Sequence, residues 1–206
     1  MRRTIRFSGI LAAALFVAAA LTLADEPKGK KAAAAPMDEK AAMDAMMKAG
    51  APGDAHKKLE ALTGTWDAKV TSWMAPGKPP MESKGKSEAK MALGGRFLEE
   101  RFEGEFMGQP FTGMGYTGYD NVQKKYVGTW MDSMSTGVMT SSGKMDADGK
   151  TFSMTGSMAD PMTGKMSTVK EKVTVADPDH HTFEMWGAGP GGKNFKMMEI
   201  VYTRRK

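Results

Sequence analysis

The chain has 206 residues, of which 29 are Lys or Arg and 24 are Asp or Glu, giving a formal net charge of +5 at pH 7. It has no cysteine, which excludes disulfide bonds and thiolate metal sites. Three of the basic residues lie in the first six positions, so the remainder of the chain is close to neutral. The sequence therefore offers no clustered basic surface for nucleic acid, and we expect no nucleic-acid partner.

The first 24 residues predict a secretory signal peptide. Arg2, Arg3 and Arg6 form a basic start, and an apolar run follows over residues 10–23. Small residues then precede a predicted cleavage before Asp25. The apolar run is nearer to signal-peptide length than to the about 20 residues of a membrane-spanning helix. We expect an exported protein, periplasmic or extracellular, with no membrane attachment after cleavage near Ala24.

Residues 25–53 predict a linker that contains a methionine-rich helix. The stretch DEPKGKKAAAA, residues 25–35, is charged and alanine-rich and indicates a disordered tether. The stretch MDEKAAMDAMMK is composed of good helix formers and places Met43, Met46 and Met47 on one helical face. The chain thus divides into signal peptide, linker and a domain over residues 54–206.

That domain predicts a short helix followed by an all-β fold. Asp54 caps a helix ending near Leu62, and from Gly64 onward alternating runs are separated by Gly, Pro, Asn and Asp. We expect ten strands, at residues 65–74, 81–93, 96–107, 112–119, 125–134, 137–145, 151–158, 165–175, 181–186 and 195–203. Short connections favour sequential hairpins, and closure removes the sheet edges. The predicted fold is an up-and-down antiparallel β-barrel of about ten strands.

Longer stretches of the sequence resemble a known family. They are GGRFLEERFEGEFMGQPFTGMGYTGYDNVQKKYVGTWMDSMSTG, residues 94–137, together with ADPMTGK, HHTFEMWG and KNFKMMEIVYTR. Over roughly residues 54–206 the chain is similar to the bacterial family called domain of unknown function 1579. The resemblance implies a lipocalin-like, or calycin-like, barrel and brings no established reaction, ligand or catalytic residue.

A tripeptide occurs twice, as Gly64-Thr65-Trp66 and as Gly128-Thr129-Trp130. The residues that follow differ, DAKVTSWM against MDSMSTGVM, so we infer no internal duplication. The first copy follows a short helix and resembles the Gly-x-Trp that opens lipocalin-like barrels, with its Trp across the barrel base. The second copy lies deep in the meander, and we expect its Trp to point inward.

Carboxylates interrupt several apolar rows that strand alternation creates. The candidate ligand-binding residues are Glu100, Trp130, Asp132, Glu199, Tyr202 and Arg204. An inward carboxylate is costly unless it is hydrated or paired, so these acids indicate a polar, water-containing cavity. The competing interpretations are a misread register, acids at a wet rim, and an exposed strand end for Tyr202 and Arg204.

The remaining motifs give weaker indications of a functional site. Gly113-x-Gly115-x-x-Gly118 matches a dinucleotide fingerprint, but it leads into a turn and another strand instead of a helix. His180 and His181 are adjacent in a strand and face opposite ways, so they cannot share one interior metal. One of them resembles the haem ligand of similar barrels, although a turn role after Asp177 is favoured. We expect no metal, no cofactor and no catalytic residue.

The 21 methionines permit two interpretations. Soft thioethers bind Cu(I), and Met43, Met46 and Met47 resemble such a cluster. Many strand methionines instead alternate with polar residues, which favours filling of the core.

Three classes of function remain open at this point. We expect a non-catalytic barrel whose partner is a small apolar or amphipathic molecule. The alternatives are an enzyme that uses cavity carboxylates such as Glu100 and Asp132, and a packed structural or interaction barrel; haem and Cu(I) binding are minor alternatives. The sequence gives no oligomeric state.

Overall fold

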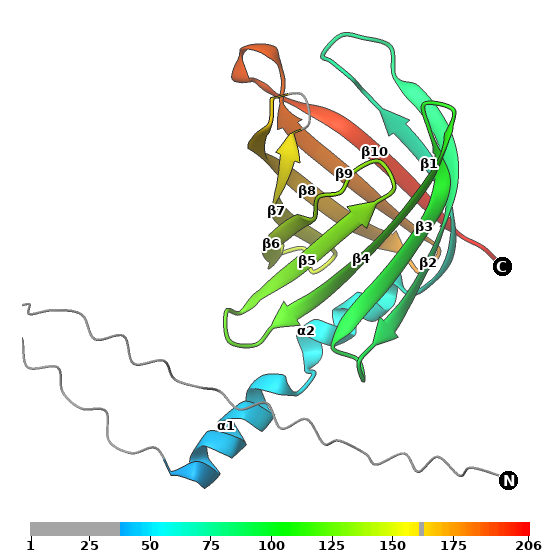
Figure 1. Ribbon diagram of the computed structural model, residues 1–206. Helices are drawn as coiled ribbons and strands as arrows, with labels where there is room; N and C mark the ends of the chain where they lie inside the picture. Colours follow the sequence, from blue (N-terminus) through cyan, green and yellow to red (C-terminus); the bar gives the residue numbers. More distant parts are fainter. Residues whose placement is uncertain (1–37, 161–162) are drawn as a thin grey trace, which may run out of the picture. The chain divides into compact units, whose positions relative to one another are not determined.

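The computed structural model describes residues 38–160 and 163–206, so the predicted signal peptide and tether lie outside the described residues. Ten antiparallel strands form one closed barrel (Figure 1) in the order β1-β10-β9-β8-β7-β6-β5-β4-β3-β2. Each strand pairs with its neighbour in sequence, and the first and last strands pair to close the sheet. The predicted fold class is confirmed.

The helical elements are α1 (Glu39–Gly50), α2 (Asp54–Lys57) and the 3₁₀ helices η1 (Lys58–Leu62) and η2 (Pro190–Gly192). The strands are β1 (Gly64–Ser72), β2 (Met81–Ala92), β3 (Phe97–Phe106), β4 (Gln109–Asp120), β5 (Lys125–Asp132), β6 (Met139–Met145), β7 (Thr151–Asp160), β8 (Lys165–Asp177), β9 (His180–Ala188) and β10 (Asn194–Arg204). Turn residues separate them as the sequence predicted.

Helix α1 presents its methionines to solvent. Asp38 caps it by accepting a hydrogen bond from the Lys40 backbone N–H at 3.2 Å. None of its residues is buried, and Met43, Met46 and Met47 are 57%, 70% and 69% exposed. The expectation that methionines fill the core was made for the strands, and these three helical methionines take no part in it.

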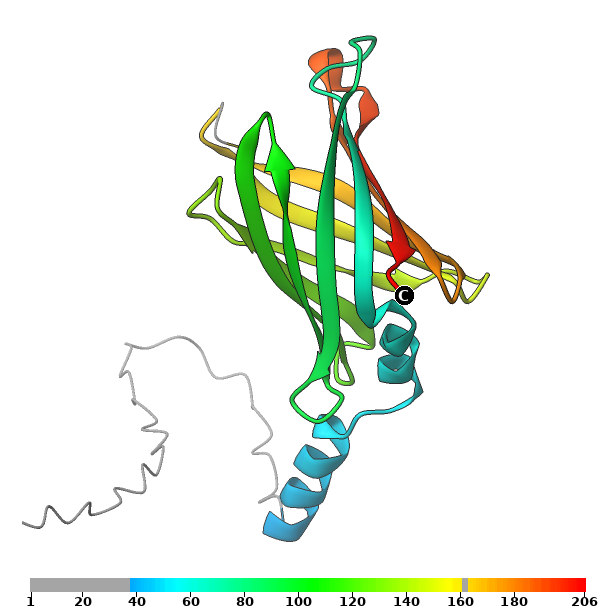
Figure 2. The same cartoon turned by 90° about the vertical axis from the view of Figure 1, so that its right-hand side faces the viewer.

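The short helical segment α2–η1 closes one end of the barrel, which we call the base (Figure 2). Leu59 is fully buried and Leu62 is 9% exposed, because both pack among apolar side chains of the barrel walls. Tyr126 Oη donates a hydrogen bond to the Ala55 carbonyl at 3.0 Å, and Trp66 Nε1 donates one to the Leu62 carbonyl at 3.0 Å. The apolar face of this segment is thus fixed on the barrel by hydrogen bonds as well as by packing.

Two apolar clusters occupy the interior. One joins the base to the walls and contains Leu59, Leu62, Ala89, Leu98, Tyr126 and Phe152. The other contains Trp66, Ala68, Val70, Phe102, Ile200 and Tyr202, with Phe111, Trp130, Phe183 and Met198 packed against it. Methionines do contribute here, since Met91, Met145 and Met154 pack against the first cluster. Strand alternation sends these residues inward and leaves most of the charged ones outside.

Candidate functional site

A cavity of about 70 Å³ lies inside the barrel. Its polar lining consists of Ser87, Glu100, Thr117, His181 and Tyr202, which come from five different strands. Leucine, aromatic and methionine side chains from the base and the walls form most of the remaining lining. The cavity therefore offers a cluster of hydrogen-bonding groups within otherwise apolar surroundings, which is typical of small-molecule sites.

Glu100 supplies the carboxylate of this cavity. It lies on β3 between the inward-facing Leu98 and Phe102, so alternation turns it into the barrel. Ser87 Oγ donates a hydrogen bond to its Oε1 at 2.7 Å, and Tyr202 Oη donates to the same oxygen at 3.4 Å. Burial raises the pKa of the Glu100 carboxyl, while the hydrogen bonds from Ser87 and Tyr202 act in the opposite direction.

His181 and Tyr202 form a stacked pair beside this carboxylate. Their ring centroids lie 4.2 Å apart with an interplanar angle of 13°, and Trp66 meets the imidazole edge-on at 4.3 Å. Burial, and to a smaller extent the charge of Arg204, lower the pKa of His181 from 6.5 to about 4, so the imidazole is neutral at pH 7. Burial and Glu100 together raise the pKa of Tyr202 well above its ordinary value.

The imidazole of His181 is 7% exposed, and its Nδ1 has no hydrogen-bond partner among the described residues. The favoured expectation of a turn role is thus wrong for this residue. His180 faces outward, and its Nδ1 lies 2.9 Å from Asp177 Oδ1. The two histidines do face opposite ways, as their adjacency predicted.

Arg204 shares the inward face with Tyr202, but it lies at the base instead of at a barrel mouth. Its guanidinium carbon lies 4.0 Å from the centroid of the Trp66 ring. The guanidinium donates hydrogen bonds to the backbone carbonyls of Thr63 and Pro178, each at 2.8 Å. These contacts fix the guanidinium, so Arg204 helps to close the base.

Trp130 and Asp132 lie together towards the other end of the interior, where β5 ends. Trp130 Nε1 donates a hydrogen bond to Asp132 Oδ2 at 3.2 Å. The indole covers Gly113 on β4, where an added Cβ would lie only 2.2 Å from the ring. The inward direction of Trp130 matches the expectation. It is half-buried, whereas Trp66 of the first tripeptide is 1% exposed.

Glu199 does not face the interior. Buried Ile200 and Tyr202 fix the inward positions of β10, and Glu199 points outward, where Lys196 Nζ reaches its Oε2 at 2.6 Å. The expected inward direction was wrong because the register shifts between Lys196 and Met198, and this shift moves side chains to the other face. Glu199 is therefore separated from the cavity by the barrel wall.

Sequence reasoning missed Glu171, a second interior carboxyl. It lies on β8 between inward-facing Val169 and Val173 and is 3% exposed. Burial raises its pKa, against the effect of a hydrogen bond with the Ser141 hydroxyl. No ion-pair partner for it is found among the described residues. The alternation of valines around it in VKEKV was the signal that would have identified it.

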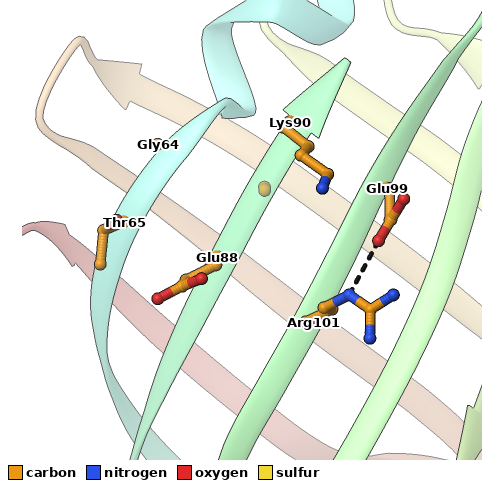
Figure 3. Close-up of a pocket in the computed structure, with 7 residues that line it drawn as sticks. Gly64, Thr65, Glu88, Lys90, Glu99 and Arg101 are labelled. Atoms are coloured by element: carbon orange, nitrogen blue, oxygen red, sulfur yellow. Dashed lines mark hydrogen bonds and ion pairs between the residues drawn. The ribbon is translucent and has the colours of Figure 1, made fainter. Parts of the chain in front are cut away.

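A larger groove of about 250 Å³ lies on the outer face of β1, β2 and β3 (Figure 3). It is lined by Gly64, Thr65, Glu88, Ala89, Lys90, Glu99 and Arg101. Arg101 Nε donates to Glu99 Oε1 at 2.8 Å, and this hydrogen bond holds the pKa of Glu99 below its usual value. Acids and bases interleave across this surface and neutralise one another, as on an ordinary solvated sheet face. We therefore place the candidate site in the smaller interior cavity.

The cavity also limits which cofactors fit. Pockets for drug-sized molecules measure roughly 300–1,000 Å³, so the space beside His181 is too small for haem. Across residues 38–160 and 163–206, no group of three or more His, Cys, Asp or Glu is arranged to hold a metal ion. Within the same ranges, no helix has the length and apolarity needed to span a membrane.

Comparisons with known proteins support the fold. Residues 51–204 match the family described as protein of unknown function (DUF1579). No curated protein matches the sequence. The barrel is similar to the crystal structure of Rv2717c from M. tuberculosis, with a TM-score of 0.58 and 15% identity over 76% of this chain and 100% of that one. It is also similar to the S-type phycobiliprotein lyase CPES from Guillardia theta, with a TM-score of 0.51 and 12% identity over 74% of this chain and 93% of that one. At identities this low, the structural similarity shows a common barrel fold alone.

Proposed function

Because the chain belongs to the DUF1579 family, whose description assigns no function, we propose a role from its own interior: an exported, non-catalytic barrel that binds a small amphipathic molecule. The observation that carries this proposal is the interior cavity in which Ser87, Glu100, Thr117, His181 and Tyr202 meet an apolar wall. A polar group of the ligand forms hydrogen bonds with these polar side chains, and its apolar part packs on the apolar wall. The basic start and apolar run of the sequence support export.

The volume of the cavity sets the size of the ligand. An apolar cavity of about 150 Å³ holds benzene, so a cavity of about 70 Å³ admits about half as many heavy atoms. Larger molecules require displacement of a wall residue. Met154 lines the cavity and has the flexible side chain for such a movement.

Acid–base catalysis by Glu100 is the second candidate, because a buried cavity carboxyl with a raised pKa is a common catalytic group. Binding without catalysis is favoured because the titratable side chains next to Glu100, those of Tyr202 and His181, resist ionisation. The pKa of Tyr202 is raised well above its ordinary value, and that of His181 is lowered to about 4.

A screen of solutes with two to four heavy atoms tests the binding function. NMR of the full chain follows the indole N–H of Trp66, which lines the cavity. We expect saturable shifts for some solutes in the wild type and their loss in Ala89→Val, whose two added methyl groups enter the cavity. Equal shifts in both proteins would place binding elsewhere.

N-terminal sequencing of the protein from its own cells tests export, with Asp25 as the expected first residue and an intact Met1 as the contrary result.

A further inference from the structure

We propose that the polar group recognised in the cavity is a protonated amine, with Glu100 as its counter-ion. This inference rests on the proposed binding function and adds the charge and chemical class of the ligand. It depends on the distribution of charge in the interior, on the unused hydrogen-bonding capacity of Glu100 and on the aromatic wall.

The interior is acidic. Among the described residues, Glu100 and Glu171 lie between inward-facing apolar residues of their strands, and Asp132 lies on the face of β5 that carries Trp130. The basic residue Arg204 also faces inward. Trp66 and two backbone carbonyls hold its guanidinium at the closed end of the barrel. No lysine among the described residues is buried. A buried carboxylate without a cation is costly, so an incoming cation would gain more here than a neutral or anionic molecule.

Glu100 has one oxygen available for such a ligand. The hydroxyls of Ser87 and Tyr202 both donate to Oε1, at 2.7 and 3.4 Å. No described residue donates a hydrogen bond to Oε2, and the side chain lines the cavity while remaining half-buried. An ammonium N–H placed in the cavity would therefore find an acceptor that the protein leaves unused, in a charge-assisted hydrogen bond.

The rest of the lining is suited to the same chemistry. Trp66, Phe152, Phe183 and Tyr202 surround the cavity, and aromatic faces attract cations. His181 also lines it, is 7% exposed and keeps an unpartnered Nδ1. Because its pKa is about 4, the imidazole brings no positive charge that would repel an ammonium at neutral pH.

The binding should respond to pH in one direction. The titratable groups facing Glu100 are Tyr202 on β10 and His181 on β9, with the Arg204 cation beyond the imidazole, while β2 and β4 contribute Ser87 and Thr117. Tyr202 and His181 stay neutral around pH 7. A cation stabilises the ionised form of Glu100, so binding releases a proton. Affinity should then rise as pH increases through the pKa of the free carboxyl and level off above it.

Three probes of similar size and different charge test the proposal, each titrated into the full chain: ethylammonium chloride, ethanol and sodium acetate. The Trp66 indole N–H again reports binding. We expect ethylammonium to bind about tenfold or more tightly than ethanol, the scale of one charged hydrogen bond, and acetate not to bind. Glu100→Gln should remove the preference for the cation. Glu99→Gln is the matched control, because Glu99 lies on the outer face of the same strand.

The outcomes separate the two proposals. If ethanol and ethylammonium bind equally in the wild type, the amine proposal is overturned while the binding function stands. If no probe shifts the Trp66 signal, the amine proposal is overturned, and the wider solute screen decides the binding function. Should Glu100→Gln fail to fold, the wild-type affinities for the three probes and the pH dependence for ethylammonium decide the question.

Discussion

Replacement of His181 by Phe should change how the stability of the barrel depends on pH. Phe preserves a planar ring between Tyr202 and Trp66 but cannot bind a proton. In the native wild type, burial and Arg204 lower the pKa of the imidazole from 6.5 to about 4. The unfolded chain therefore binds a proton at His181 between these pH values, and the native protein does not.

The size of the effect follows from this difference in pKa. One pKa unit corresponds to about 1.4 kcal/mol, so the lowering from 6.5 to about 4 amounts to about 3 kcal/mol in the free energy of unfolding. The free energy of unfolding decreases as the pH falls, because the unfolded state binds this proton at a higher pH than the native state does. The contribution of His181 to stability is thus complete above pH 6.5 and is lost as the pH falls towards 4.

Glu100 and Glu171 act in the opposite direction. Burial raises the pKa of both carboxyls, so they favour the native state at acidic pH, and this contribution is lost as pH rises through their native pKa values. The stability of the wild type alone is therefore a mixture of opposing effects. Both glutamates are present in wild type and variant, and the difference between the two proteins isolates the histidine.

Urea unfolding between pH 7.5 and pH 4, followed by circular dichroism, measures this difference. The advantage of wild type over His181→Phe should shrink by about 3 kcal/mol on acidification. His180→Phe serves as the control, because it removes the adjacent imidazole from the outer face. A wild-type advantage that is constant across this range would refute the inference that His181 is buried and neutral.

Three further variants test the packing and the interior acids, each by urea unfolding. Leu59→Ala should lower the free energy of unfolding by about 2–5 kcal/mol, because the side chain that joins the base to the walls is fully buried; a change near zero would mean that the base is dispensable. Gly143→Ala should cost about 1–3 kcal/mol, since its Cβ would lie 2.0 Å from the Ser153 carbonyl oxygen; a neutral result would contradict this close approach of β6 and β7. Glu171→Gln should stabilise the protein more at pH 7 than at pH 4, because it removes a buried carboxyl whose pKa is raised. Equal effects at the two pH values would show that burial does not raise the pKa of this carboxyl.

The barrel was predictable because its signals are local. Alternating side chains and turn residues define each strand, and short connections leave neighbouring strands few alternatives to antiparallel pairing. The same alternation placed Glu100 correctly, since Leu98 and Phe102 flank it at the spacing of one strand face. Trp130 was placed inward by the same reasoning, whereas an exposed strand end was the competing interpretation for Tyr202, which is buried.

The remaining parts depend on information that alternation does not contain. The register shift before Met198 reverses the direction expected for Glu199. His181 is next to a turn in sequence, but the paired strands carry it into the interior beside Trp66. The cavity itself joins side chains from strands far apart in the chain, such as Ser87 and Tyr202, and no spacing within either strand indicates their meeting.

Because β1 pairs with β10, the barrel closes only after the last strand of the chain is present. Trp66 lies opposite Arg204, and Ser72 lies opposite Met198, so the seam joins residues more than a hundred positions apart. A nascent chain that lacks β10 leaves β1 and β9 as open edges, which are templates for pairing with other chains. Long-range contacts of this kind also form late and slowly. Synthesis of this protein therefore includes an interval, ended only by its last strand, in which a chaperone that covers strand edges would be of most use.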